Sequence, residues 1–132
     1  MAEPIARTRA SLVLLSSRIS GAEIAQRLGV RSDRHWNAGD PVRPGSKTQQ
    51  KFAGWEINSR VDRSLAARAH LDDLLERVAD LTGPINEMVT SGDIDSARIW
   101  LHLDSPSTGF SLEPATMRQI AWFGSLEVDI YG

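Results

Sequence analysis

The residues with the most useful chemistry alternate along one segment near the end of the chain. Arg98, Trp100 and His102 recur at every second position within residues 95–104. Alternate residues of a β-strand lie on the same face of the sheet, so a cation, an indole and an imidazole would share one surface. Tyr131 would join them from the last strand. Aromatic rings beside charged groups are typical of surfaces that bind another protein. We therefore expect a module that binds a protein, or a second copy of itself, through this face and the loop over residues 33–51.

Other interpretations of this face stay open. The loop over residues 30–51 could fold over the face and bury Trp100 as core. Trp36, which lies in that loop, either pins the loop to the sheet or lines a small-ligand pocket with Trp100 and His102. A hydrolase that uses His102 with Asp104 is a third possibility, but the sequence indicates neither a nucleophile nor a metal for it.

The charge of the predicted face favours a protein partner, or a second copy of the chain, over nucleic acid. Sheets that bind single strands combine stacking aromatics with positive charge. Here Glu56, Glu127 and Asp129 would accompany Arg98. The cations gather instead around the first helix and the long loop, at Arg27, Arg31, Arg34, Arg43, Lys47 and Lys51. We interpret that loop as solvated.

Motifs for catalysis or cofactors are missing from the sequence. It contains no GxGxxG, GxxxxGK[ST], GxSxG or HExxH pattern and no cysteine. His35, His70 and His102 lack the spacing of metal ligands. His70 and Asp73 lie three residues apart on a predicted helix, which fits a carboxylate–histidine pair or a surface hydrogen bond. We therefore expect no cofactor, no metal and no enzymatic activity.

The elements that must position these residues alternate between strand and helix. Strands are predicted over residues 7–16, 53–60, 95–104 and 126–131, and helices over 20–28, 65–81 and 111–123, with a short further helix at 84–89. Residues 12–15 are apolar on both faces, which is typical of a central strand. Trp55 is expected in the core beside Ile57.

The strand patterns favour an α+β fold over a parallel α/β sheet. Strands of parallel sheets are covered on both faces and read as continuous apolar runs, whereas three of these four strands alternate. We predict a two-layer sandwich with about four strands, in a largely antiparallel or mixed sheet, and three helices on one face.

Length and composition indicate one domain over residues 1–132. No apolar run is long enough to cross a membrane and no signal peptide is recognisable, so we expect a cytoplasmic protein. The charge is uneven: residues 1–66 carry 11 Lys and Arg against 6 Asp and Glu, whereas residues 67–132 carry 4 against 11. The simplest interpretation is that the two oppositely charged halves fold against each other.

Several of these segments together resemble a bacterial family described only as a domain of unknown function. The resemblance covers nearly the whole chain and rests on the order of IAQRLGV (24–30), DRHWNAGD (33–40), GWEINS (54–59), HLDDLL (70–75), GFSL (109–112) and DIY (129–131). Arg31 departs from it, because a proline would be expected after the helix. The resemblance implies a small stand-alone bacterial cytoplasmic protein and assigns no catalytic residue.

Overall fold

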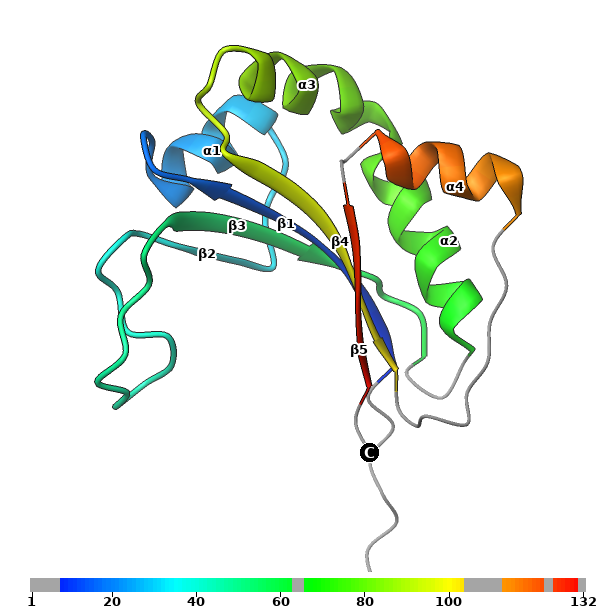
Figure 1. The fold of residues 1–132 in the computed structure, drawn as a ribbon, viewed down its shortest axis with the longest axis horizontal. Helices are drawn as coiled ribbons and strands as arrows, with labels where there is room; N and C mark the ends of the chain where they lie inside the picture. Colours follow the sequence, from blue (N-terminus) through cyan, green and yellow to red (C-terminus); the bar gives the residue numbers. More distant parts are fainter. Residues whose placement is uncertain (1–7, 63–65, 104–112, 123–124, 131–132) are drawn as a thin grey trace, which may run out of the picture. The chain divides into compact units, whose positions relative to one another are not determined.

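A computed structural model describes residues 8–62, 66–103 and 113–122, and the backbone of 125–130 (Figure 1). Within them five strands form one sheet in the order β2-β3-β1-β4-β5. The strands are β1 (Arg9–Ser16), β2 (Arg34–Trp36), β3 (Ala53–Asn58), β4 (Ser96–Leu103) and β5 (Ser125–Ile130). The helices are α1 (Gly21–Leu28), α2 (Ala67–Val78), α3 (Thr82–Thr90) and α4 (Pro114–Ala121), and the 3₁₀ turn η1 (Ala79–Leu81) joins α2 to α3.

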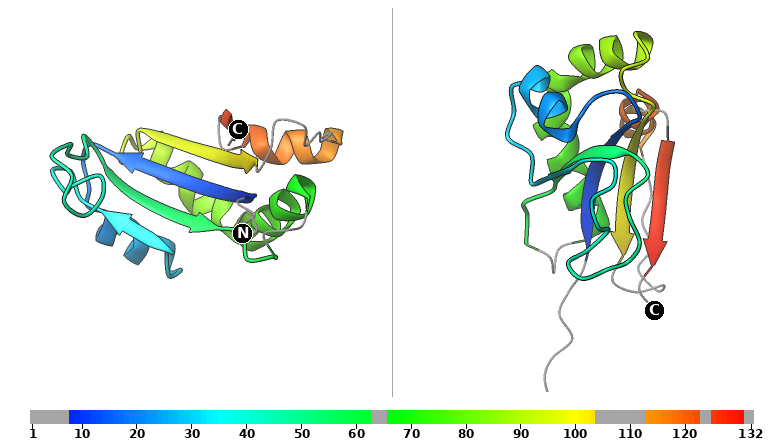
Figure 2. Two further views of the ribbon diagram at one scale, coloured as in Figure 1. Left: turned by 90° about the horizontal axis from the view of Figure 1, so that it is seen from below. Right: turned by 90° about the vertical axis from the view of Figure 1, so that its left-hand side faces the viewer.

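The sheet is mixed, and the predicted α+β class is confirmed. β1 occupies the middle of the sheet, as its apolar run predicted, and Figure 2 shows it running opposite to both neighbours, β3 and β4. β2 pairs with β3 in antiparallel fashion, and β4 pairs with β5 in parallel. A parallel neighbour needs a crossover connection, and α4 supplies a helix between β4 and β5.

β2 is an addition to the predicted strands, because it lies inside the segment predicted as a loop. It spans three residues and pairs Arg34 with Glu56 and Trp36 with Gly54. Three residues are too few to show an alternating pattern, and such short edge strands are held by pairing and by side-chain contacts. The short helix predicted over 84–89 is realised in the longer α3.

The chain divides into two compact units, each built from separate stretches of sequence. Unit 1 contains residues 1–12, 58–79 and 98–132, and unit 2 contains residues 13–57 and 80–97. Each unit is described by itself below. The prediction of a single domain stays a prediction.

The core of unit 1 is built around α2. Leucines three and four residues apart place one apolar stripe on this helix, and its members Leu71, Leu74, Leu75 and Val78 are buried. α4 packs against both α2 and β5, and its Ile120 is buried. Ile99 and Leu101 of β4 are fully buried, so one face of this strand belongs to the core.

The core of unit 2 forms around α1 and β3. The hydroxyl of Ser20 caps α1 by accepting a hydrogen bond from the Glu23 backbone N–H at 3.1 Å. The helix ends at Gly29, whose φ of 68° is the left-handed conformation that glycine adopts without strain. α1 contacts β2 and α3. Trp55 is fully buried, as predicted, and Ile24 is buried on α1.

Candidate functional site

Three of the predicted site residues lie together on β4 in unit 1. Arg98 is exposed, Trp100 is half-buried, and His102 is buried, with 9% of its surface exposed. The residues between them, Ile99 and Leu101, are fully buried. One face of β4 therefore belongs to the core, while burial of the other face increases from Arg98 to His102. We call Arg98, Trp100 and His102 the β4 platform.

The two rings of the β4 platform are stacked. The centroids of the Trp100 and His102 rings lie 5.5 Å apart, and the ring planes differ by 8°. Parallel rings at this distance cover part of each other's faces. Among the described residues, the buried Trp100 indole N–H has no hydrogen-bond partner, and neither does that of the fully buried Trp55. This feature alone therefore does not separate Trp100 from a core tryptophan.

The last strand brings acidic residues to register positions beside the platform. In the parallel pairing of β4 with β5, Trp100 aligns with Glu127 and His102 aligns with Asp129. Two other residues of the sequence hypotheses, Tyr131 and Asp104, lie outside the described residues. Two predictions therefore remain untested. One is that Tyr131 belongs to the binding face, and the other is that His102 pairs with Asp104.

Trp36 belongs to unit 2, where it fastens the long loop to β3. Its indole N–H donates to the carbonyl oxygen of Phe52 at 3.1 Å. The ring lies so close to Gly54 that a Cβ at that position would be 2.1 Å from the Trp36 Cζ2 atom. The Arg34 guanidinium lies over the Trp36 side chain, 4.7 Å from a ring centroid. These contacts favour the pinning interpretation of Trp36.

The segment that follows Trp36 is an ordered ribbon. Backbone hydrogen bonds join Gly39 to Gln50 and Val42 to Thr48, and Pro41 pairs with Gln49. The ribbon turns at residues 43–46, where Pro44 and Gly45 occupy the middle positions and Gly45 has a φ of 78°. Proline followed by a glycine of positive φ is typical of a type II turn. We call residues 39–51 the arm.

His70 forms a hydrogen bond that the sequence did not indicate. Its Nδ1 atom lies 2.8 Å from the Ser59 hydroxyl, which also accepts from the Ala10 backbone N–H at 3.1 Å. The carboxylate of Asp73, proposed as its partner, accepts from the Arg60 backbone N–H at 2.8 Å. A serine beside a histidine can act as a nucleophile, but His70 is 1% exposed and cannot meet a substrate. This pair is a structural link between the end of β3 and α2.

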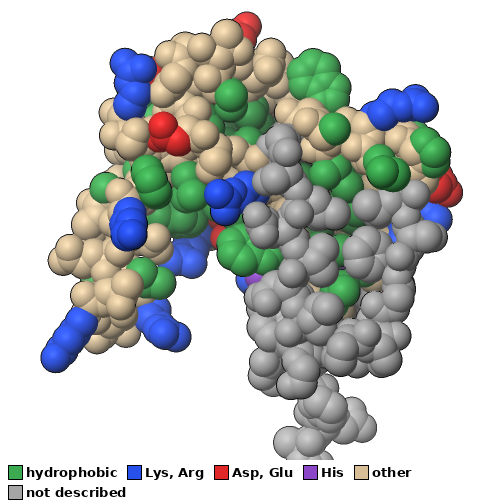
Figure 3. All heavy atoms as spheres, in the orientation of Figure 1, with side chains coloured by type: hydrophobic (Ala, Val, Ile, Leu, Met, Phe, Trp, Pro, Cys, Tyr) green, Lys and Arg blue, Asp and Glu red, His purple; other side chains and the backbone are tan. Residues whose placement is uncertain are grey.

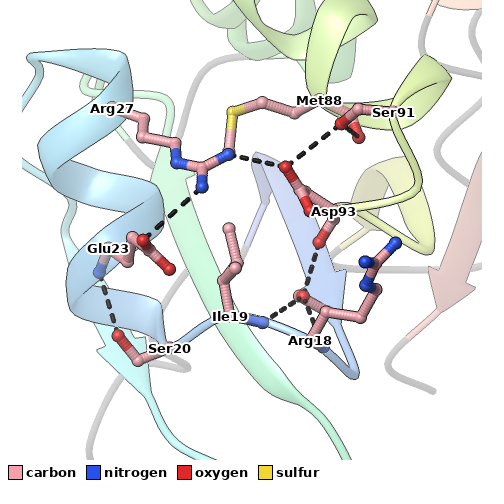
Figure 4. A network of polar contacts seen from close by, with 9 residues as sticks. Arg18, Ile19, Ser20, Glu23, Arg27, Met88, Ser91 and Asp93 are labelled. Atoms are coloured by element: carbon pink, nitrogen blue, oxygen red, sulfur yellow. Dashed lines mark hydrogen bonds and ion pairs between the residues drawn. The ribbon is translucent and has the colours of Figure 1, made fainter.

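A shallow hollow of about 330 Å³ lies in unit 2 and was not predicted from the sequence. Its lining residues come from α1, α3 and the turn after α3, and they are Arg27, Pro84, Glu87, Met88, Ser91 and Asp93. Arg27 donates to the Asp93 carboxylate at 2.7 Å and lies 3.5 Å from Glu23 (Figure 4). Arg27 and Asp93 are 66 residues apart in the chain, so no local pattern could reveal the pair.

The ion pair in the hollow changes the acidity of its carboxylate. The hydrogen bond from Arg27 lowers the pKa of Asp93, and a second hydrogen bond from the Ser91 hydroxyl at 3.1 Å lowers it further. The same contact raises the pKa of Arg27. Arg27 and Asp93 thus neutralise each other and join α1 to the turn after α3, and we call this pair the Arg27–Asp93 clasp.

Comparisons with known proteins give the family. None of the helices in the described ranges is long and apolar enough to cross a membrane. No curated protein and no solved structure matches the chain. A family model described as a domain of unknown function, DUF4279, matches residues 6–132. The chain therefore belongs to the DUF4279 family, in agreement with the resemblance of its sequence segments.

Proposed function

We propose that the protein is a non-enzymatic protein-interaction module that binds its partner through the β4 platform. The observation that carries the proposal is the half-buried Trp100, which stacks on His102 at 5.5 Å between centroids on the strand face opposite the buried Ile99 and Leu101. Binding hot spots are enriched in tryptophan and arginine, and this surface offers one of each, with Arg98 exposed.

The surroundings of the platform support an interface rather than a catalytic site. Trp100 should lose little side-chain entropy on binding, because the ring stack with His102 already holds it in place. Arg98 supplies a charged rim at one end of it. Self-association and binding of a foreign protein, such as an inhibitor-like or immunity-like role, are both forms of this proposal.

The small-ligand alternative has weaker support. It requires Trp36 to line a pocket with Trp100 and His102. The polar atom of the Trp36 side chain is already bonded to Phe52, and its ring covers Gly54. Trp36 thus has a structural role, so fewer of its side-chain atoms can contact a ligand. Quenching of tryptophan fluorescence by a small molecule, lost in Trp36→Phe, would favour this alternative.

The first test is the solution mass measured by light scattering in about 1 M salt, at which charge–charge attraction is screened beyond about 3 Å. A self-associating platform gives a dimer in which Trp100→Asp and Arg98→Glu each produce a monomer with an unchanged circular dichroism spectrum. Trp122→Asp is the matched control, because Trp122 is a 62% exposed aromatic of the same unit outside the platform.

If the wild type is a monomer, the next test looks for a foreign partner. A photo-crosslinking amino acid at position 98 should then give a discrete adduct in cells, and the adduct should disappear when Trp100→Asp is added. The same amino acid at position 122 should give no such adduct. A monomeric wild type that gives no Trp100-dependent adduct would show that the proposal is wrong. The proposal would also be wrong if Trp100→Asp unfolds and the folded Trp100→Phe variant associates as the wild type does.

A further inference from the structure

We infer that the arm, residues 39–51, is a second docking element, which binds the acidic surface of another copy of this chain. The arm carries three exposed cations, Arg43, Lys47 and Lys51. Figure 3 shows Lys and Arg side chains gathered where the arm projects. None of the three forms an ion pair with any residue that the structure describes.

The acidic residue of the arm does not neutralise these cations. The carboxylate of Asp40 accepts a hydrogen bond from the backbone N–H of Asn37 at 2.8 Å. It therefore serves the turn at the base of the arm. The tip, which turns at residues 43–46, presents positive charge alone.

The arm is ordered without a partner bound. Its two sides are joined by backbone hydrogen bonds of 2.7 to 2.9 Å, between residues 39 and 50, 40 and 50, and 42 and 48. The Arg34 guanidinium donates to the Val42 carbonyl oxygen at 3.1 Å, and Trp36, which precedes the arm, is fixed against Gly54. A segment that is already ordered loses little entropy on binding, so modest electrostatic attraction is enough for association.

Unit 1 supplies an acidic surface of the matching kind. Asp72 and Glu76 lie four residues apart on α2, and both are exposed. Residues four apart lie on the same side of a helix, so the two carboxylates share one surface. Asp72 is 3.7 Å from Arg68, while Glu76 forms no ion pair with any described residue.

The opposite charges of the two halves are thus displayed on the surface. If the excess charge of residues 1–66 and 67–132 served only internal pairing, these side chains would be in ion pairs. Complementary potentials on separate surfaces of one chain favour association between copies. Nucleic acid is a poorer fit, because three cations are few for a phosphate backbone and the arm offers no aromatic ring within residues 39–51.

The test is the dependence of solution mass on salt and on the arm. At about 0.1 M salt, where the Debye length is about 10 Å, the wild type should associate through the arm as its concentration rises. At about 1 M this association should be lost, so that only the mass given by the β4 platform remains. Arg43→Glu/Lys47→Glu should weaken the salt-sensitive association at least about tenfold, and so should Asp72→Lys/Glu76→Lys. An equimolar mixture of the two variants should associate again, because the second variant regains a complementary surface.

A matched control separates position from net charge. Arg31→Glu/Arg118→Glu changes the net charge by the same amount as the arm variant, at two exposed arginines outside the arm. It should associate like the wild type.

Three results would overturn the inference: a wild type that stays monomeric at low salt, an association that the arm variant leaves unchanged, or a control that is as defective as the arm variant. Arm-dependent binding of a labelled single-stranded oligonucleotide in place of self-association would reassign the arm to nucleic acid. Trp100→Asp should leave this salt-sensitive association intact, so failure of the arm and failure of the β4 platform are distinguishable.

Discussion

Trp36 in unit 2 and Trp100 in unit 1 are both half-buried tryptophans on strands, but their surroundings differ. The Trp36 N–H donates to Phe52 and its ring seals the surface over Gly54. The Trp100 N–H has no partner among the described residues, as is also true of the core Trp55, and its ring stacks on another side chain of the same strand. Trp36 therefore joins two segments of the chain. Trp100 is half-buried and makes no such link among the described residues, so it is the better candidate for binding.

The tight packing of unit 2 gives the largest expected effect. A Cβ on Gly21 would lie 2.6 Å from the backbone oxygens of Trp36 and Gly54, so Gly21→Ala must push the start of α1 away from β2 and β3. We expect the free energy of unfolding in urea to fall by about 3 kcal/mol. Gly83→Ala, with open space around its Cβ, should change it by less than about 1 kcal/mol.

Equal losses in Gly21→Ala and Gly83→Ala would contradict this account of unit 2. The helix propensity of alanine exceeds that of glycine, so a stabilised Gly21→Ala would show that α1 and the strands have room to separate. The midpoint and the slope of each urea transition distinguish these outcomes.

Truncating the two tryptophans tests the comparison directly. Trp36→Ala should lower the free energy of unfolding by about 2–3 kcal/mol, because it removes a hydrogen bond and uncovers β3. Trp100→Ala should cost about 1 kcal/mol, because it removes a ring stack and no hydrogen bond. A larger loss for Trp100→Ala would make Trp100 part of the core and would weaken the β4 platform as a binding surface.

The alternation of β4 could be predicted from the sequence, whereas most of the partners of its candidate residues could not. A period of two separates Ile99 and Leu101 from Trp100, and this is a local property of the chain. The contact of Trp36 with Gly54 joins residues 18 positions apart across two strands. Such contacts depend on strand pairing, which local periodicity does not determine.

Serine–histidine pairs occur in both units and differ in burial. Ser59 and His70 of unit 1 are 2.8 Å apart with the imidazole buried, whereas Ser32 and His35 of unit 2 are 3.3 Å apart and exposed. Ser59→Ala should lower the free energy of unfolding by about 1–2 kcal/mol, because buried polar atoms lose their partner. Ser32→Ala should lie within about 0.5 kcal/mol of the wild type, because water replaces the hydroxyl. If both substitutions changed the free energy of unfolding equally, burial would not explain the difference between the two serine–histidine pairs.

The smallest expected effect concerns the Arg27–Asp93 clasp and appears as a dependence on pH. The pKa of Asp93 is lower in the folded protein than in the unfolded chain, because Arg27 and Ser91 donate hydrogen bonds to the carboxylate. Its stabilising effect is therefore complete above the unfolded pKa, about 3.9, and is lost as the pH falls through the lower folded value. Asp93→Asn should be less stable than the wild type at neutral pH, and the difference in urea midpoint should shrink as the solution becomes strongly acidic. The pair is partly exposed, so the difference should also shrink in high salt. A difference that is the same at neutral and at acidic pH would mean that Asp93 acts through packing in the clasp and not through its charge.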